Sequence, residues 1–403
     1  YQNVAIGNGA LLDNTIGYYN TATGVNALQK NISGEDNTAI GQAALQQNLA
    51  SKNTAVGAWS LRNNIDGINN TAIGYHTLNK NISGTRNVAM GNWALDENTT
   101  GSWNTAIGKS VLENNTEGNS NVAIGDSSLY ANISGNSNVA VGNNSMYANI
   151  TGKNNVAVGN GALENSTTDR NTAVGNNSMN ANTIGTENAA FGEASLQRNI
   201  DGIKNTAIGK QAMDDNVSGS ENTAIGYQSL RENLSGNHNA AMGIQGLLYN
   251  TTGHDNTSVG FQALVANTEG NHNTAVGKWG LGSNLIGNNN TSLGHTAGSW
   301  ATGSDNVFLG YKAGYNVTTA SNKLYIANSD TNNLITGDFS TGTVTFNDVY
   351  TFPTADGTAN QVLTSDGAGN LSWANETITL STLKSITAAS SDFADFQTRI
   401  AAL

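Results

Sequence analysis

The chain repeats one short pattern of polar, small and aliphatic residues along most of its length. The unit is the pentapeptide Asn-(Thr/Val/Ala)-(Ala/Ser)-aliphatic-Gly, which starts 19 times between Asn3 and Asn306. Successive copies start 17 residues apart, except for three steps of 16 residues. Self-similarity with so short and regular a period predicts a solenoid in which each copy forms one coil.

Apolar and polar residues alternate within each copy, as they do in a β-strand. In the copy at 37–41, Thr38 and Ile40 share one face and the other three residues share the opposite face. After the glycine we expect a corner and a second short strand, whose Leu45 points back toward Ile40. No apolar stripe with helical period is present. The sequence therefore predicts an all-β fold, a parallel β-solenoid of 19 coils of 16–17 residues. At a coil spacing of about 4.8 Å, the rod would be roughly 90 Å long.

The first and fifth positions of the copy form an Asn column and a Gly column. An amide side chain carries both a donor and an acceptor, so stacked asparagines can form a ladder between coils. Glycine at position 5 occurs in all 19 copies and indicates a backbone requirement rather than a phosphate-binding loop. Representative residues of this structural ladder are Asn37, Asn70, Asn104, Asn121, Gly41, Gly74, Gly108 and Gly125.

One chain of this kind offers only about two large core side chains per coil, at positions 4 and 9. Their burial contributes about 1.5–3 kcal/mol each, whereas ordering the backbone costs about 1–2 kcal/mol per residue. Position 3 is Ala in 16 of the 19 copies, which would let a neighbouring chain approach closely. We therefore expect three chains to pack side by side as a homotrimer.

The repeats resemble those of two families of surface fibres. Copies such as 121–125 (NVAIG) are similar to the head repeat of trimeric autotransporter adhesins, although the period here is longer. That resemblance implies an obligate homotrimer built on a left-handed parallel β-roll. Residues 306–316, 321–328 and 351–373 resemble phage and prophage tail-fibre proteins, many of which end in a self-cleaving intramolecular chaperone.

The regular pattern ends after Asn306 and divides the chain into three regions. These are a β-solenoid rod over 1–320, a β-rich connector over 321–375, and a linker with a short coiled-coil helix over 376–403. Within the connector, apolar–polar alternation over 323–348 predicts short strands.

A helix is expected from Ser390 onward, with Ser390 or Ser391 as its cap and Asp392 and Asp395 in its first turn. The apolar residues at helical spacing are Phe393, Phe396, Ile400 and Leu403. So short a helix is not stable alone, which favours a trimeric bundle; packing against the chain's own β-region is the alternative.

Composition narrows the possible functions. Only 11% of residues are charged, the net charge is −12, and the chain has no cysteine. This argues against a nucleic-acid groove and a disulfide framework. No apolar stretch is long enough to cross a bilayer, so we expect no membrane insertion.

Candidate catalytic groups are sparse, and we expect no enzyme activity, no cofactor and no metal site. His238 and His272 share repeat position 17, and His254 lies one position earlier in the coil between them. A threefold axis could turn one of them into a ring, but without metal-ligand spacing we favour exposed loop histidines. Asp214-Asp215 is a close pair of carboxylates within the coils.

Aromatic side chains gather at positions 6 and 7, just after the corner glycine. They could stack on sugars or pack laterally against a neighbouring chain or coil, and the second interpretation is favoured. These possible surface-contact residues are Trp59, Tyr75, His76, Trp93, Tyr227, Phe261 and Trp279. Position 2 is Thr in only 11 of the 19 copies, so a threonine array for ice binding would be broken.

Together these observations favour a structural fibre of a phage tail that presents or contributes to host-receptor binding. The alternatives are a bacterial surface trimeric adhesin and, less favoured, a tailspike glycan hydrolase or an ice-binding protein. The expected partners are two further copies of the chain, baseplate or tail proteins, and a host surface glycan or protein receptor, but no nucleic acid. The expected location is the virion tail, outside the cell, or alternatively the bacterial surface. Because Tyr1 lies two residues before a full copy, we expect the chain to be a fragment of a longer fibre.

Overall fold

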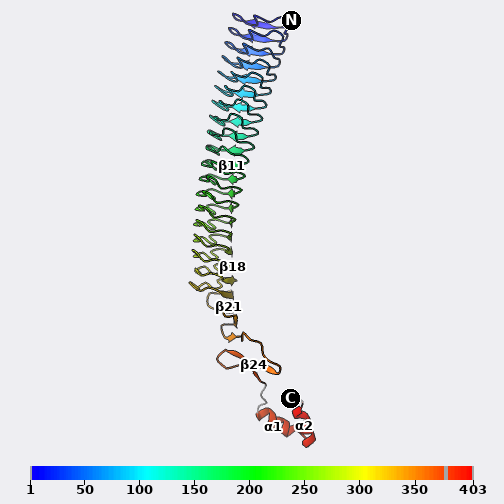
Figure 1. Cartoon of the computed structure of the whole chain (residues 1–403), viewed down its shortest axis with the longest axis vertical. Coiled ribbons are helices and arrows are strands. Elements are labelled where there is room, and N and C mark those ends of the chain that lie inside the picture. The colour runs from blue at the N-terminus through cyan, green and yellow to red at the C-terminus, as the bar shows by residue number, and fades with distance from the viewer. Residues whose placement is uncertain (1, 376–379, 402–403) are drawn as a thin grey trace.

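The computed structural model describes residues 2–375 and 380–401 and shows a long stack of coils followed by a small C-terminal region (Figure 1). Each copy of the repeat supplies one three-residue strand. These strands are β1 (Val4–Ile6), β2 (Thr21–Thr23), β3 (Thr38–Ile40), β4 (Thr54–Val56), β5 (Thr71–Ile73), β6 (Val88–Met90), β7 (Thr105–Ile107), β8 (Val122–Ile124), β9 (Val139–Val141), β10 (Val156–Val158), β11 (Thr172–Val174), β12 (Ala189–Phe191), β13 (Thr206–Ile208), β14 (Thr223–Ile225), β15 (Ala240–Met242), β16 (Thr257–Val259), β17 (Thr274–Val276), β18 (Thr291–Leu293) and β19 (Val307–Leu309). The predicted parallel β-solenoid of 19 coils is confirmed.

Each strand pairs in parallel with the strand of the next coil, equivalent residue against equivalent residue. Ala123, for example, lies opposite Ala140. A 16-residue step leaves this register unchanged, because Ala39 still pairs with Ala55. The missing residue is therefore absorbed outside the strands, and every column of the repeat runs along the whole stack.

The structure reverses part of the predicted inside–outside arrangement. Ala39 and Leu45 are fully buried, whereas Ile40 is 42% exposed. The prediction that Leu45 points toward an inward-facing Ile40 is therefore wrong, and so is the placement of the Ala column on the outer surface. The reason lies in Asn37, whose Nδ2 donates to the carbonyl of Ala50 across the coil at 2.9 Å. Since alternate strand residues share a face, an inward Asn37 places Ala39 inside and Ile40 outside.

The predicted second strand of each coil is also absent from the described residues. In coil 3 the segment after the corner glycine is a turn, in which Ala43 and Leu45 have left-handed φ values of 55° and 50°. This conformation breaks the extended geometry of a strand. The turns still stack, because the N–H of Leu45 donates to the carbonyl of Ser60 in the next coil at 3.0 Å.

Position 9 is Leu or Met in the first 17 coils, and this Leu column ends after Leu281. Phe308 explains its end, because Phe308 is fully buried where the other coils have Ala or Ser at position 3. Gly298 and Gly314 occupy position 9 in the last two coils, and a Cβ added to either would lie within 2.4 Å of the Phe308 ring. The phenyl ring therefore fills the space that Leu occupies elsewhere.

Beyond the repeats, β20 (Lys323–Ala327) pairs in parallel with β19 and extends the ladder by one rung. The chain then turns into antiparallel strands, β21 (Asn333–Asp338), β22 (Thr343–Phe346) and β23 (Tyr350–Thr351), and a separate hairpin. That hairpin consists of β24 (Gln361–Ser365) and β25 (Leu371–Asn375). The short strands predicted over 323–348 are confirmed.

Two helices lie near the C-terminus, α1 (Leu380–Ala389) and α2 (Phe393–Ala401). The helix expected after Ser390 is confirmed as α2, whereas α1 was not predicted. The cap is Asp392 rather than a serine, because its Oδ1 accepts the N–H of Asp395 at 2.9 Å. The carboxylate of Asp395 in turn accepts the N–H of Ser391, the residue before the cap, at 2.9 Å. The predicted Leu403 lies outside the described residues.

Candidate functional site

Buried asparagines form two ladders inside the coils. At position 1, Asn138 donates its backbone N–H to Asn121 Oδ1 at 3.0 Å and its Nδ2 to the carbonyl of Gly152 at 2.8 Å. At position 12, Asn132 donates Nδ2 to Asn115 Oδ1 at 2.7 Å. All of these side chains are buried, so they hold the coils together and are not available to a ligand. The ladder residues Asn37, Asn70, Asn104 and Asn121 are fully buried.

The corner glycines stack closely on one another. Gly125 has a φ of +124°, and a Cβ added there would lie 2.6 Å from the carbonyl oxygen of Gly142 in the next coil. A side chain is therefore excluded both by conformation and by contact with backbone. Gly41, Gly74 and Gly108 have the same positive φ and the same neighbour, the corner glycine of the next coil.

An aliphatic column is left exposed along the outer face of the strands. It consists of the position 4 side chains, together with the Thr and Val side chains of position 2. The members of position 4 that are most exposed are Ile6, Ile40, Ile73, Met90, Ile107, Ile124, Val158, Phe191, Ile208, Ile225, Met242 and Leu293. At the C-terminal end the column reaches a groove of about 530 Å³ lined by Leu309, Ile326 and Leu334. Position 4 is apolar in every coil except coil 2, which has Thr23, and an exposed apolar surface of this length is typical of an interaction face.

Four of the seven predicted aromatic residues form one cluster across coils 4 to 6. The ring centroids of Trp59 and His76 are 4.7 Å apart, and those of Tyr75 and His76 are 4.5 Å apart. Tyr75 also lies 5.5 Å from Trp59 and 6.1 Å from Trp93. Tyr75 and Trp93 are 40% and 37% exposed. We call Trp59, Tyr75, His76 and Trp93 the aromatic cluster.

Two polar side chains beside the aromatic cluster have unpaired oxygens. Asn79 approaches His76 Nδ1 through its Nδ2 at 3.4 Å, and Asp96 approaches the same nitrogen through Oδ1 at 3.7 Å. Asn79 Oδ1 and Asp96 Oδ1 are both buried without a hydrogen-bond partner. Burial raises the pKa of Asp96, partly offset by the neighbouring His76. Neither residue was predicted from the sequence, although each lies three positions after an aromatic of the cluster.

The other three predicted aromatics lie apart from this cluster. Tyr227, Phe261 and Trp279 are exposed and come from later coils. Lys278 places its Nζ 5.6 Å from the ring centroid of Phe261, a cation–π distance. Phe261 and Trp279 lie in adjacent coils, where the N–H of Trp279 donates to the carbonyl of Phe261 at 3.0 Å, whereas Tyr227 comes from an earlier coil.

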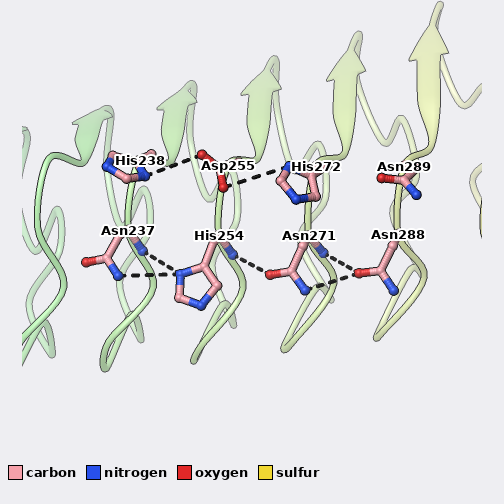
Figure 2. Close-up of a pocket in the computed structure, with 8 residues that line it drawn as sticks. All are labelled: Asn237, His238, His254, Asp255, Asn271, His272, Asn288 and Asn289. Carbon is pink, nitrogen blue, oxygen red and sulfur yellow. Dashed lines mark hydrogen bonds and ion pairs between the residues drawn. The ribbon is translucent and has the colours of Figure 1, made fainter.

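The predicted histidines of position 17, His238 and His272, lie in one row with the carboxylate of Asp255 between them (Figure 2). His238 Nδ1 lies 3.4 Å from Asp255 Oδ1, and His272 Nδ1 lies 3.8 Å from Asp255 Oδ2. His238 Nε2 also lies 3.3 Å from Glu221 in the preceding coil. Asp255 was not predicted from the sequence, although it occupies position 17 of the coil between the two histidines.

His254 belongs to a second row beside the first. The two rows together line a groove with a volume of about 670 Å³. His254 Nδ1 accepts the backbone N–H of Asn237 at 3.2 Å, which requires that Nδ1 carries no proton. The backbone N–H of His254 donates to Asn271 Oδ1 at 2.8 Å (Figure 2). His254 thus takes the place of the Asn side chains that do the same in neighbouring coils.

The close carboxylate pair does not converge on a cleft. Asp214 is buried, and burial raises its pKa with a further contribution from Asp215. Asp215 pairs with Arg198 in the preceding coil. Within residues 2–375 and 380–401, no three His, Asp, Glu or Cys side chains are grouped so that they could hold a metal ion.

The helices that the structure describes are too short or too polar to cross a membrane. No protein-family model matches this chain, and no curated protein matches its sequence.

Proposed function

We propose that this chain is one subunit of a homotrimeric structural fibre of a phage tail, which holds receptor-binding surfaces away from its base. The observation that carries the proposal is the exposed aliphatic column, which runs the length of the solenoid on one face. It replaces the Ala column as the surface on which neighbouring chains would pack.

Burial of this column gives a physical reason for assembly. Apolar surface removed from water contributes about 25 cal/mol per Å². The column repeats once per coil, and every coil of a partner chain has the same spacing, so parallel chains in register would bury it continuously. In a trimer, each of the three chains would turn its aliphatic column toward the common axis, so that all three columns are shielded from water.

The regular ladder also suits a mechanical role. Every coil is joined to the next by parallel strand pairs, by Asn side chains and by stacked turns. Stacked ladders of this kind make stiff rods. Exposed residues that recur along a rod would allow weak contacts to act together on a host surface.

A phage origin is preferred to a bacterial adhesin because of the resemblance of the C-terminal segments 306–328 and 351–373 to tail-fibre proteins. The proposed partners are baseplate or tail proteins at one end and a host glycan or protein receptor. The proposed location is the virion tail.

The test is the mass in solution, measured by light scattering with and without denaturant. We expect three times the chain mass of 41.7 kDa in native buffer and the single-chain mass in denaturant. A native mass of one chain would overturn the trimeric fibre.

Ice binding is the second candidate, because the Thr side chains of position 2 lie on the same outward face of an in-register sheet. It predicts a monomer that keeps this face free and produces thermal hysteresis. A monomeric mass together with hysteresis would favour ice binding over the fibre.

A further inference from the structure

The aromatic cluster of coils 4 to 6 is not needed to build a coil. Position 7 elsewhere holds Gln211, Gln228, Gln245 and Gln262, whose amides bond to one another at 2.7–3.1 Å. The same position also accommodates Ala, Asn, Ser and Gly in other coils. Stacking therefore proceeds without aromatic rings, and the aromatic cluster requires another explanation.

Three of its members lie at position 7, where every coil has a left-handed backbone. Trp59, His76 and Trp93 have φ values of 61°, 57° and 59°, and Gln211 has a φ of 57° at the same position. This conformation belongs to the repeat, so the side chains and not the backbone distinguish coils 4 to 6. Tyr75 and Trp93 are also exposed.

The corner that carries the aromatic cluster lies on the water side of the rod. Position 6 holds charged residues in several coils, including Lys109, Asp126, Glu193 and Lys210. Lys210 and Glu193 pair at 3.0 Å with both side chains more than half exposed. A chain packed against this corner would have to bury these charges, which is costly. The cluster is therefore accessible in a trimer that packs through the aliphatic column.

The polar groups beside the rings include two buried oxygens without a hydrogen-bond partner, Asn79 Oδ1 and Asp96 Oδ1. Asn79 Nδ2 is a donor 3.4 Å from His76 Nδ1, and Asp96 Oδ1 lies 3.7 Å from the same nitrogen. Both oxygens are buried, so a ligand would reach them only after the His76 side chain moved. Nearby, Lys80 is already paired with Glu97 at 2.6 Å, so Asp96 leaves the local charge negative. The site favours a ligand rich in hydroxyl donors and without negative charge.

We propose that the aromatic cluster binds a neutral glycan, with sugar rings stacked on Tyr75 and Trp93 and sugar hydroxyls donating to Asn79 and Asp96. This inference deepens the proposed receptor-binding function and rests on it. Sialylated or phosphorylated glycans would be repelled by the unpaired negative charge of Asp96.

The test is a screen of the intact chain against immobilised neutral, sialylated and phosphorylated glycans, followed by titration of the neutral glycans that bind. The variants Trp93→Gln and Tyr75→Asn introduce residues that other coils already carry at positions 7 and 6. We expect each to raise the Kd about tenfold or more through the loss of ring contact. Asp96→Asn should weaken binding less than the ring variants. The matched control, Trp279→Gln, changes position 7 in a coil outside the cluster and should leave the Kd unchanged.

Solution mass is measured on every variant. A wild-type chain that binds no neutral glycan, or that binds equally well after Trp93→Gln and Tyr75→Asn, would overturn the site while a trimeric mass leaves the fibre standing. A loss of trimer in Trp93→Gln would also overturn it, because the cluster would then be a contact between chains.

Discussion

Asn121 Oδ1 accepts two hydrogen bonds from Asn138 in the next coil, one from the backbone N–H at 3.0 Å and one from Nδ2 at 3.2 Å. Asn138 Oδ1 accepts the same pair from Asn155. Each buried amide is thus satisfied by its neighbours along the axis. Stability in such a stack depends on nearest-neighbour contacts, so damage to one coil weakens its junctions with the next.

Replacement of Asn138 by Ala should therefore be strongly destabilising. The change leaves the N–H of Asn155 without a partner in the interior, whereas the carbonyl of Gly152 keeps the bond from Asn149 Nδ2 at 3.2 Å. At about 1–3 kcal/mol per unsatisfied buried group, we expect a loss of roughly 1–3 kcal/mol in the free energy of unfolding. Denaturant unfolding at fixed protein concentration measures it. The control Asn160→Ala, at an exposed position, should change stability by less than about 0.5 kcal/mol.

The inward position of Ala123 can be tested by enlarging it. Ala123 is fully buried, so Ala123→Leu should overpack the coil and cost about 1–3 kcal/mol or more. Ala123→Ser should be tolerated, because Ser258 occupies the same position and donates its hydroxyl to the carbonyl of Ala263 at 2.8 Å. Equal stability of the Leu and Ser variants would contradict an inward-facing Ala column.

Charges placed on the aliphatic column should separate assembly from folding. Ile107 and Ile124 are exposed in the single chain, so the double variant Ile107→Asp, Ile124→Asp should keep the β-sheet circular dichroism of the wild type. If chains pack through this column, six buried carboxylates per trimer would disfavour association, and the mass should fall to one chain. A mass unchanged from the wild-type trimer would show that the chains meet elsewhere. Asn160→Asp supplies the control for added charge on an exposed corner.

The junction between the solenoid and the antiparallel strands should be sensitive to acid. Lys323 and Asp338 are partners across β20 and β21, and the Lys323 ammonium, aided by the Ser340 hydroxyl, lowers the pKa of Asp338 to about 2. Because the unfolded pKa is about 3.9, this stabilisation is complete above about pH 4 and is lost as the pH falls through 2. Carboxyl NMR titration should give a midpoint near 2 for Asp338. Asp338→Asn should show a smaller loss of stability than the wild type between pH 4 and pH 2, and an ordinary midpoint for Asp338 would refute the pairing.

The buried carboxyl of Asp214 leads to the opposite dependence on pH. Burial raises its pKa, so the ionised form is unfavourable in the folded chain at neutral pH. Asp214→Asn should therefore stabilise the protein at pH 7, and the gain should shrink as the pH falls through the raised pKa of the wild-type group. Thermal unfolding at pH 7 and pH 4 measures both effects, and destabilisation at pH 7 would contradict them.

Part of the candidate site could be predicted from the repeat alone. Trp59, His76 and Trp93 share position 7 in consecutive copies, so their proximity follows from the coil spacing. Asn79 and Asp96 were missed, although position 10 lies on the same coil, because nothing in a single copy shows that their oxygens lack partners. Asp255 shares position 17 with His238 and His272, but only the structure shows that its carboxylate lies within 3.4 Å and 3.8 Å of their ring nitrogens.

The sequence by itself determined the period, the parallel stacking of 19 coils, the need for glycine at the corners and the change of structure after Asn306. These follow from spacing and backbone geometry, which a repeat displays many times over. Only the tertiary structure decided which face of the strand is inside. From hydrophobicity alone, Ile40 was predicted to lie in the core. Asn37, however, must reach across the coil to the carbonyl of Ala50, and residues three apart in a strand point to opposite faces, so Asn37 and Ile40 cannot both point inward. The satisfaction of buried backbone groups outweighed the burial of one aliphatic side chain and left that side chain for another surface to cover.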